Sequence, residues 1–205
     1  MTNVSSQSGF SASYKGQKKS IRSSKYVANL DSGTAGWQIP QSALNQILEL
    51  WTDIANVAVT YNSSVLVPCS YINTDASITI GLTGANNVST DIEVPLGNML
   101  VPALTSETTG DYNDTRPLVI NGTEQCLFTP SAAPDNSTEF LVGDPFFRSA
   151  YVFINLDAGT ISLAQASYNA NDSNIVPVGA ASSPSSYPSG SGSEEPLPSY
   201  TPVDG

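Results

Sequence analysis

The sequence predicts a mainly β fold with short helices, followed by a Ser/Pro-rich tail. Apolar residues alternate with other residues over 78–82 and 92–94, which is the two-residue period of a strand with one buried face. Helical spacing of apolar residues occurs in one segment, residues 40–54. After residue 178 the chain is rich in Ser, Pro and Gly with almost no large aliphatic side chains. Such a segment cannot bury enough apolar surface to offset its ordering entropy, so we expect residues 179–205 to be disordered.

The first expected element is a hairpin over residues 14–30, which are polar with scattered β-forming residues. Five of the seven positive charges lie here: Lys15, Lys18, Lys19, Arg22 and Lys25. A cluster of this kind is either a docking patch for an acidic partner or the solvated surface of a hairpin, and we expect the second.

A helix is expected next, because Pro40 suits the first turn of a helix and apolar residues follow at helical spacing. The residues that share this face are Leu44, Ile47, Leu48, Trp51 and Ile54. We expect Trp51 to pack in the core.

Strands are expected from residue 64 onward, with an exposed polar loop over 104–116. Asp144 followed by Pro145 is a signal for the N-cap of a short helix through Arg148. Two more strands are expected at 151–156 and 160–164.

The composition excludes several classes of protein. The chain has 205 residues, 40% of them hydrophobic, a net charge of −11, two Cys and no His. Without His there is no Ser-His-Asp triad, no Cys-His pair and no His-ligated metal, and two Cys are too few for a structural zinc site. The acidic balance argues against a nucleic-acid partner, and no apolar run approaches the ~20 residues that span a bilayer.

The most informative motif is Leu30-Asp31-Ser32-Gly33-Thr34. Two carboxylates that share one proton can hydrolyse a peptide bond without a metal, and an aspartate in a tight turn is one way to present such a group. Gly33 allows a close approach of the backbone, and the two hydroxyls can bond locally to hold the turn. Taken alone, Asp-Ser-Gly-Thr is also an ordinary turn sequence.

The rest of the chain supplies a context for this motif. The segment Leu-Val-Gly-Asp-Pro-Phe-Phe-Arg-Ser-Ala-Tyr-Val at 141–152 resembles a segment near the end of pepsin-like aspartic proteases. Further matches occur in the same order as in that family, at residues 66–69, 75–80, 125–128, 155–157 and 161–166. Residues 1–178 are therefore similar to the C-terminal lobe of secreted fungal aspartic proteases, which is half of a bilobal β-barrel fold.

The resemblance implies a role for each matching residue. Asp31 would be one of two catalytic aspartates of an aspartic endopeptidase, and Asp144 is interpreted as a helix cap rather than the second one. The supporting residues would be Ser32, Gly33 and Thr34 in the catalytic loop, with Leu141, Val142 and Gly143 in the strand behind it. The substrate would be an extended peptide with apolar side chains beside the scissile bond, and the resemblance implies no metal or cofactor.

The sequence departs from the family pattern in three ways. The second Asp-Thr-Gly motif and the flap Tyr belong to an N-terminal lobe, and neither is present in this sequence. We therefore expect a missing N-terminal lobe as a partner, and we interpret Met1 as an internal methionine. Ala35 stands where the family usually has Ser or Thr, which removes one hydroxyl contact to the substrate backbone.

Three alternatives to a catalytic lobe remain open. The chain could be a noncatalytic pepsin-like binding module, a homodimer in which two copies of Asp31 form the catalytic pair, or an inactive truncated product. We expect the 205-residue chain to be inactive on its own, because it holds half of the site.

Several features suggest a secretory history, with the full-length protein extracellular or at the cell surface. Cys69 and Cys126 fall where the family has a disulfide, and such a loop closure would stabilise the fold by roughly 4 kcal/mol; the alternative is two buried thiols. Glycosylation sequons occur at Asn3, Asn62, Asn87, Asn113, Asn121, Asn136 and Asn171. We interpret residues 1–30 as lacking a signal peptide and the C-terminus as lacking an anchor signal.

Overall fold

β-strands dominate the structure, as the sequence predicted. The computed structural model describes residues 2–6, 9–21, 26–84, 88–106 and 115–167, which fall within one unit, 1–167. The expected tail and the expected domain boundary at residue 178 lie outside the described residues.

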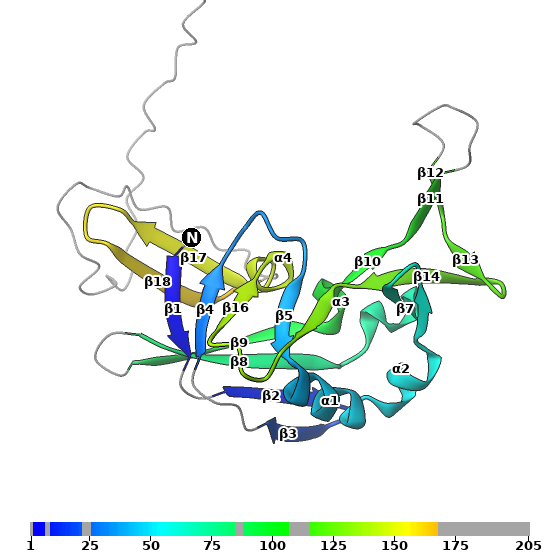
Figure 1. The fold of residues 1–205 in the computed structure, drawn as a ribbon, viewed down its shortest axis with the longest axis horizontal. Coiled ribbons are helices and arrows are strands. Elements are labelled where there is room, and N and C mark those ends of the chain that lie inside the picture. Colours follow the sequence, from blue (N-terminus) through cyan, green and yellow to red (C-terminus); the bar gives the residue numbers. More distant parts are fainter. Residues whose placement is uncertain (1, 7–8, 22–25, 85–87, 107–114, 168–205) are drawn as a thin grey trace, which may run out of the picture. The chain divides into compact units, whose positions relative to one another are not determined.

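A five-stranded sheet carries the Asp31 motif (Figure 1). Its strand order is β1-β4-β16-β5-β15. The strands are β1 (Thr2–Ser6), β4 (Tyr26–Leu30), β16 (Glu139–Val142), β5 (Trp37–Pro40) and β15 (Pro130–Ala133). β4 and β16 are parallel neighbours although more than 100 residues separate them in the chain, so the fold brings two distant segments together.

Two further sheets complete the main architecture. The first has the order β3-β2-β8-β9, with β3 (Gln17–Ile21), β2 (Gly9–Tyr14), β8 (Ser77–Thr83) and β9 (Ser89–Pro95). The second has the order β10-β14-β7-β6, with β10 (Leu100–Pro102), β14 (Thr123–Phe128), β7 (Ser64–Pro68) and β6 (Val59–Tyr61), and β13 (Val119–Ile120) pairs with β14.

Short helices and two separate hairpins complete the fold. The helices are α1 (Gln41–Leu50), α2 (Thr52–Val57), α3 (Leu96–Met99), α4 (Asp144–Phe147) and a 3-10 helix, Cys69–Asn73. The hairpins are β11 (Leu104–Ser106) with β12 (Thr115–Pro117), and β17 (Ala150–Asn155) with β18 (Thr160–Gln165). None of the described helices is both long and apolar enough to cross a membrane.

The N-terminal hairpin forms earlier in the chain than predicted. It joins β2 to β3 through a turn at Lys15 and Gly16, both with positive φ. The segment expected to be its second half instead contains β4, which pairs with β1 and β16. Lys15 forms an ion pair with Asp53, and Lys19 pairs with Glu49 at 3.0 Å. These contacts agree with the expected structural role for the basic residues; Arg22 and Lys25 lie outside the described residues.

The predicted helix at 40–54 is present, but it breaks at Trp51. This residue has φ −92° and ψ 43°, and it separates α1 from α2. Its indole is fully buried and its Nε1 donates to the Ser13 carbonyl at 3.1 Å, which confirms the expected core position. Packing of one large aromatic therefore overrides the continuous helical spacing.

The region 104–116 differs from the exposed loop that its polar sequence predicted. Its two ends pair as β11 and β12, with Leu104 opposite Pro117. Residues 107–114 lie outside the described residues. The expected strands at 78–82, 92–94, 151–156 and 160–164 are confirmed as parts of β8, β9, β17 and β18.

Candidate active site

Asp31 directly follows β4, which lies between β1 and β16 in the five-stranded sheet. β16 pairs in parallel with β4, so Leu30 lies opposite Val142. The backbone N–H of Asp31 donates to the Val142 carbonyl at 3.1 Å, which continues the ladder into the loop. Both strands end in the core: Ala28 and Leu30 of β4 and Phe140 and Val142 of β16 are buried, with Leu30 at 7% and Val142 at 1% exposure. Asp31 therefore begins a loop whose base is fixed by core packing.

The Asp31 carboxylate is held by two donors from its own loop. The Gly33 N–H donates to Oδ1 at 3.0 Å, and the Thr34 hydroxyl donates to Oδ2 at 2.8 Å. Hydrogen bonds to the ionised form stabilise it, so the Thr34 hydroxyl first and the Gly33 amide second lower the pKa of Asp31 below its ordinary value. The side chain stays half-exposed. The loop thus presents a fixed, charged carboxylate to solvent.

Gly143, the residue after β16, packs directly against the backbone of this loop. A Cβ at this position would stand 2.1 Å from the Thr34 carbonyl oxygen and 2.3 Å from that of Gly36. The next residue, Asp144, donates its N–H to the same Thr34 oxygen at 2.9 Å. Only a residue without a side chain fits here, because both neighbours are backbone atoms.

The other predicted loop residues have different surroundings. Ser32 and Ala35 are exposed, and the hydrogen bonds of the described residues include none from the Ser32 hydroxyl. Leu141 is half-buried, and its N–H donates to the Gln38 Oε1 at 3.2 Å. The Ser32 and Thr34 hydroxyls were both expected to hold the turn. Among the hydrogen bonds of the described residues, the Thr34 hydroxyl is the one that bonds the Asp31 carboxylate.

Asp144 is not the helix N-cap that the sequence predicted. Gly143 occupies that position with φ −110° and ψ −146°, and Asp144 is the first residue of α4. Its carboxylate accepts no cap hydrogen bond and instead pairs with Arg148 Nη2 at 2.7 Å, one turn later. The Asp-Pro pair therefore marks the region where the helix starts, but the helix begins one residue earlier than predicted.

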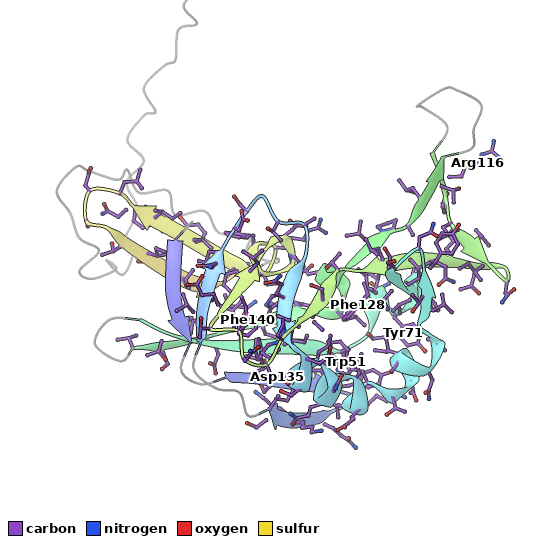
Figure 2. The ribbon with its side chains drawn as sticks, in the orientation of Figure 1. Trp51, Tyr71, Arg116, Phe128, Asp135 and Phe140 are labelled. Atoms are coloured by element: carbon purple, nitrogen blue, oxygen red, sulfur yellow. A yellow bond between two sulfur atoms is a disulfide. The ribbon has the colours of Figure 1, made fainter. Side chains whose placement is uncertain are left out.

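An apolar cavity of about 540 Å³ begins immediately after the Asp31 loop. Trp51 and Phe128, which Figure 2 labels, come from the helical side and from β14 respectively. The residues that line it include Ala35, Gly36, Leu44, Trp51, Val67 and Phe128. A substrate side chain that entered it would meet mainly aliphatic and aromatic surface.

Three residues that contact the segments around the Asp31 loop and the cavity were not predicted from the sequence. Gly36 passes so close to the Thr129 carbonyl that a Cβ would stand 2.8 Å from its oxygen. Gln38 bonds β16 through its side chain. Asp135 lies beside the start of α1 (Figure 2), and its Oδ1 accepts from the N–H and hydroxyl of Ser42 at 2.9 and 2.8 Å.

Asp135 is the functional N-terminal cap of α1, although it lies in the loop between β15 and β16. The Ser42 backbone N–H, followed by its hydroxyl, lowers the pKa of Asp135. No local sequence signal marks this contact, because 93 residues separate the partners.

The remaining predicted residues can also be placed. Cys69 and Cys126 form the expected disulfide between the 3-10 helix and β14. Asn62, Asn121 and Asn136 are exposed, while the side chain of Asn3 and residues Asn87, Asn113 and Asn171 are outside what the structure describes. Within the described part of the chain, no group of three potential ligands could hold a metal ion.

Comparison with known proteins identifies the family. The model of the eukaryotic aspartyl protease family matches residues 2–166. The chain therefore belongs to the eukaryotic aspartyl protease family, whose members act on peptides.

Three curated fungal proteins are similar to this chain, and each is described as a probable aspartic-type endopeptidase OpsB. The Aspergillus oryzae protein is 30% identical over 153 residues, which cover 73% of this chain and 26% of the relative. The Aspergillus fumigatus protein is 29% identical over 171 residues, covering 83% and 30%. The Arthroderma otae protein is 26% identical over 150 residues, covering 73% and 28%. The chain thus spans less than a third of the length of these relatives.

Proposed function

We propose that this chain is the C-terminal lobe of an aspartic endopeptidase and that Asp31 is one of its two catalytic carboxylates. The observation that carries the proposal is the Asp31 loop itself: a carboxylate fixed by the Gly33 amide and the Thr34 hydroxyl at the end of a buried strand pair. Membership of the aspartyl protease family supports the same role.

In the proposed reaction, Asp31 and a second aspartate share one proton and hold a water molecule between them. The ionised carboxylate takes a proton from the water as its oxygen attacks the peptide carbonyl carbon. The protonated carboxylic acid gives its proton to the carbonyl oxygen. Proton transfer to the leaving nitrogen then accompanies cleavage of the C–N bond. The donors to Asp31 favour its ionised form, which suits the first of these steps.

The remaining parts of the site follow from the loop and its support. Gly33 and Thr34 would fix the carboxylate, Ser32 would complete the turn, and Leu141, Val142 and Gly143 would hold the loop from behind. The apolar cavity after Ala35 favours a peptide substrate with an apolar side chain near the scissile bond. No metal or cofactor is needed for this chemistry.

The second carboxylate would come from an N-terminal lobe. The relatives are more than three times as long as the aligned part, which leaves room for such a lobe in their sequences. The β17–β18 hairpin also suits a partner, because Tyr151, Ile154 and Leu156 are 66%, 50% and 87% exposed. A two-stranded sheet is marginally stable in water by itself, so covering these side chains would stabilise it.

A secreted location follows from the disulfide and from similarity to fungal aspartic endopeptidases. Disulfides persist in oxidising compartments, so Cys69–Cys126 suits a protein of the secretory pathway. We infer that the full-length protein is extracellular or at the cell surface.

The first test is an assay of the purified 205-residue chain with a peptide substrate at pH 3–5. We expect no cleavage that a statine-type transition-state mimic inhibits, because one carboxylate is half of the site. The 5′ end of the native transcript should then reveal an in-frame extension that encodes a second Asp-Thr-Gly. Robust cleavage by the chain alone that depends on Asp31 would instead support a homodimer, and a longer frame with a degraded second motif would support the noncatalytic module.

A further inference from the structure

The hairpin between β6 and β7 has an asparagine at the tip of a two-residue turn. Tyr61 pairs with Ser64, and the residues between them, Asn62 and Ser63, have φ values of 47° and 65°. Positive φ at both central positions defines the type I′ turn that joins tightly twisted strands. Asn tolerates this conformation better than most residues, and Asn62 is exposed. Its side chain therefore projects from the hairpin tip into solvent.

β6 is an outer strand with an apolar surface. It lies at the end of the order β10-β14-β7-β6, so the described strands pair with one of its edges. Val59 and Tyr61 of β6 are 39% and 49% exposed, and Val57, the last residue of α2, is 40% exposed. The sequence from residue 54 to residue 74 contains no Asp, Glu, Lys or Arg. An exposed edge of this composition favours pairing with another chain.

The other outer strands of the larger sheets differ in this respect. Most contain a charge or a proline, which are common protections against edge-to-edge association. The protected strands are β3 with Lys18 and Lys19, β9 with Asp91 and Glu93, β10 with Pro102, and β15 with Pro130.

Two outer strands of the larger sheets have neither protection, and both are accompanied by a sequon. β1 includes Asn3 followed by Val4 and Ser5, and β6 leads into Asn62-Ser63-Ser64. The two strands of the separate β17–β18 hairpin also lack charge, and this hairpin is the surface that we assign to the partner lobe.

We propose that Asn62 carries an N-linked glycan that covers the exposed edge of β6. The donor would be an oligosaccharide on a lipid diphosphate in the secretory pathway. The Asn62 amide nitrogen bonds to the anomeric carbon, the bond from that carbon to the diphosphate oxygen breaks, and the nitrogen releases one proton. The attached glycan is bulky and hydrated, and it would lie at the end of the β6 edge, which contains no charged side chain.

The position of Asn62 is compatible with the nearby cavity. Ser63 and Ser64 belong to its lining, whereas Asn62, Val57, Val59 and Tyr61 do not. A glycan on Asn62 therefore starts at the tip of the hairpin, at a residue that does not line the cavity. The inference is independent of the proposed catalytic role, because it depends on the hairpin and on secretion alone.

The test is to secrete the full 205-residue chain from a yeast host behind an added signal peptide and to map glycans by peptide mass spectrometry. Ser64→Ala removes the sequon while it leaves Asn62 in the turn, and Ser64→Thr preserves the sequon. We expect a glycan on Asn62 in the native chain and in Ser64→Thr, and none there in Ser64→Ala. An unmodified Asn62 in secreted, folded native protein would overturn the proposal.

A second measurement tests the covering role. We expect Ser64→Ala, and native protein treated with an endoglycosidase under native conditions, to aggregate several-fold faster than untreated native protein. Thr123→Ala is the matched control, since it removes the Asn121 sequon at another exposed two-residue turn. Equal aggregation of the glycosylated and unglycosylated forms would show that the glycan does not protect β6.

Discussion

Asp31 and Asp144 each follow one of two neighbouring parallel strands, yet their carboxylates have different partners. Asp31 follows β4 and accepts hydrogen bonds from an amide and a hydroxyl within its own loop. Asp144 follows β16 and pairs with the Arg148 guanidinium 2.7 Å away. The two loops contact each other directly, because the Asp144 N–H donates to the Thr34 carbonyl.

The difference shows how a fold separates a reactive acid from a structural one. Neutral donors fix Asp31 while they leave its charge uncompensated, so it can take part in proton transfer with a second carboxylate. The Arg148 cation compensates the charge of Asp144. Two aspartates that closely follow the ends of adjacent strands therefore do not have equivalent chemistry.

The largest expected difference between the two aspartates is in catalysis by the longer, two-lobed protein. Asp31→Asn should reduce kcat/KM on a peptide at acid pH by at least about 10³-fold, because it removes one half of the acid–base pair. Asp144→Asn should retain most of the activity. Comparable losses in the two variants would contradict the distinction drawn above.

Gly143→Ala should have the next largest effect, because it forces the two loops apart. The new Cβ would stand 2.1 Å from a backbone oxygen, and we expect a loss of about 3 kcal/mol or more in urea unfolding of this chain. Gly16→Ala is the control. Gly16 has φ +72° and open space around it, so the cost should be about 1 kcal/mol, from backbone strain alone. Equal costs would mean that the close contact at Gly143 is not as described.

Thr34→Val should affect Asp31 and leave Asp144 unchanged. Valine keeps the shape of threonine but removes the main donor that lowers the pKa of Asp31, so this pKa should rise toward its ordinary value of 3.8. A lowered folded-state pKa stabilises the fold above the unfolded value, and this contribution disappears as pH falls through the folded value. The native chain should therefore be more stable than Thr34→Val at pH 6, with a smaller difference at pH 2. A difference that grew toward low pH would contradict this sign.

Asp144→Asn should have the smallest effect on stability. Its ion pair with Arg148 is one turn apart on a short helix and partly exposed, so its loss should cost about 0.5 kcal/mol. Urea unfolding at low and high salt measures this. A loss comparable with that of Gly143→Ala would mean that the ion pair holds the Asp31 loop in place.

The sequence predicted those strands and loops that depend on local residue patterns. Alternating apolar residues located β8 and β9, and the Asp-Ser-Gly-Thr motif located the loop at the end of β4. The family resemblance named Leu141, Val142 and Gly143, and the structure places them beside that loop.

The parts that the sequence did not predict depend on contacts between distant segments. The helix breaks at Trp51 because its indole packs in the core and bonds Ser13, which no helical periodicity encodes. Asp144 is displaced from the cap position because Gly143 must approach Thr34 and Gly36. Asp135 caps α1 across 93 residues. Each of these outcomes required the partner segment to be in place.

The most direct test of the account is an NMR titration of the Asp31 side-chain carboxyl in the purified 205-residue chain. We expect a single step with a pKa below 3.8, because the Thr34 hydroxyl and the Gly33 amide stabilise one isolated carboxylate. A raised pKa, or two steps shared with a second carboxyl, would show that Asp31 already has an acidic partner. That result would contradict the conclusion that this chain provides one half of a catalytic pair.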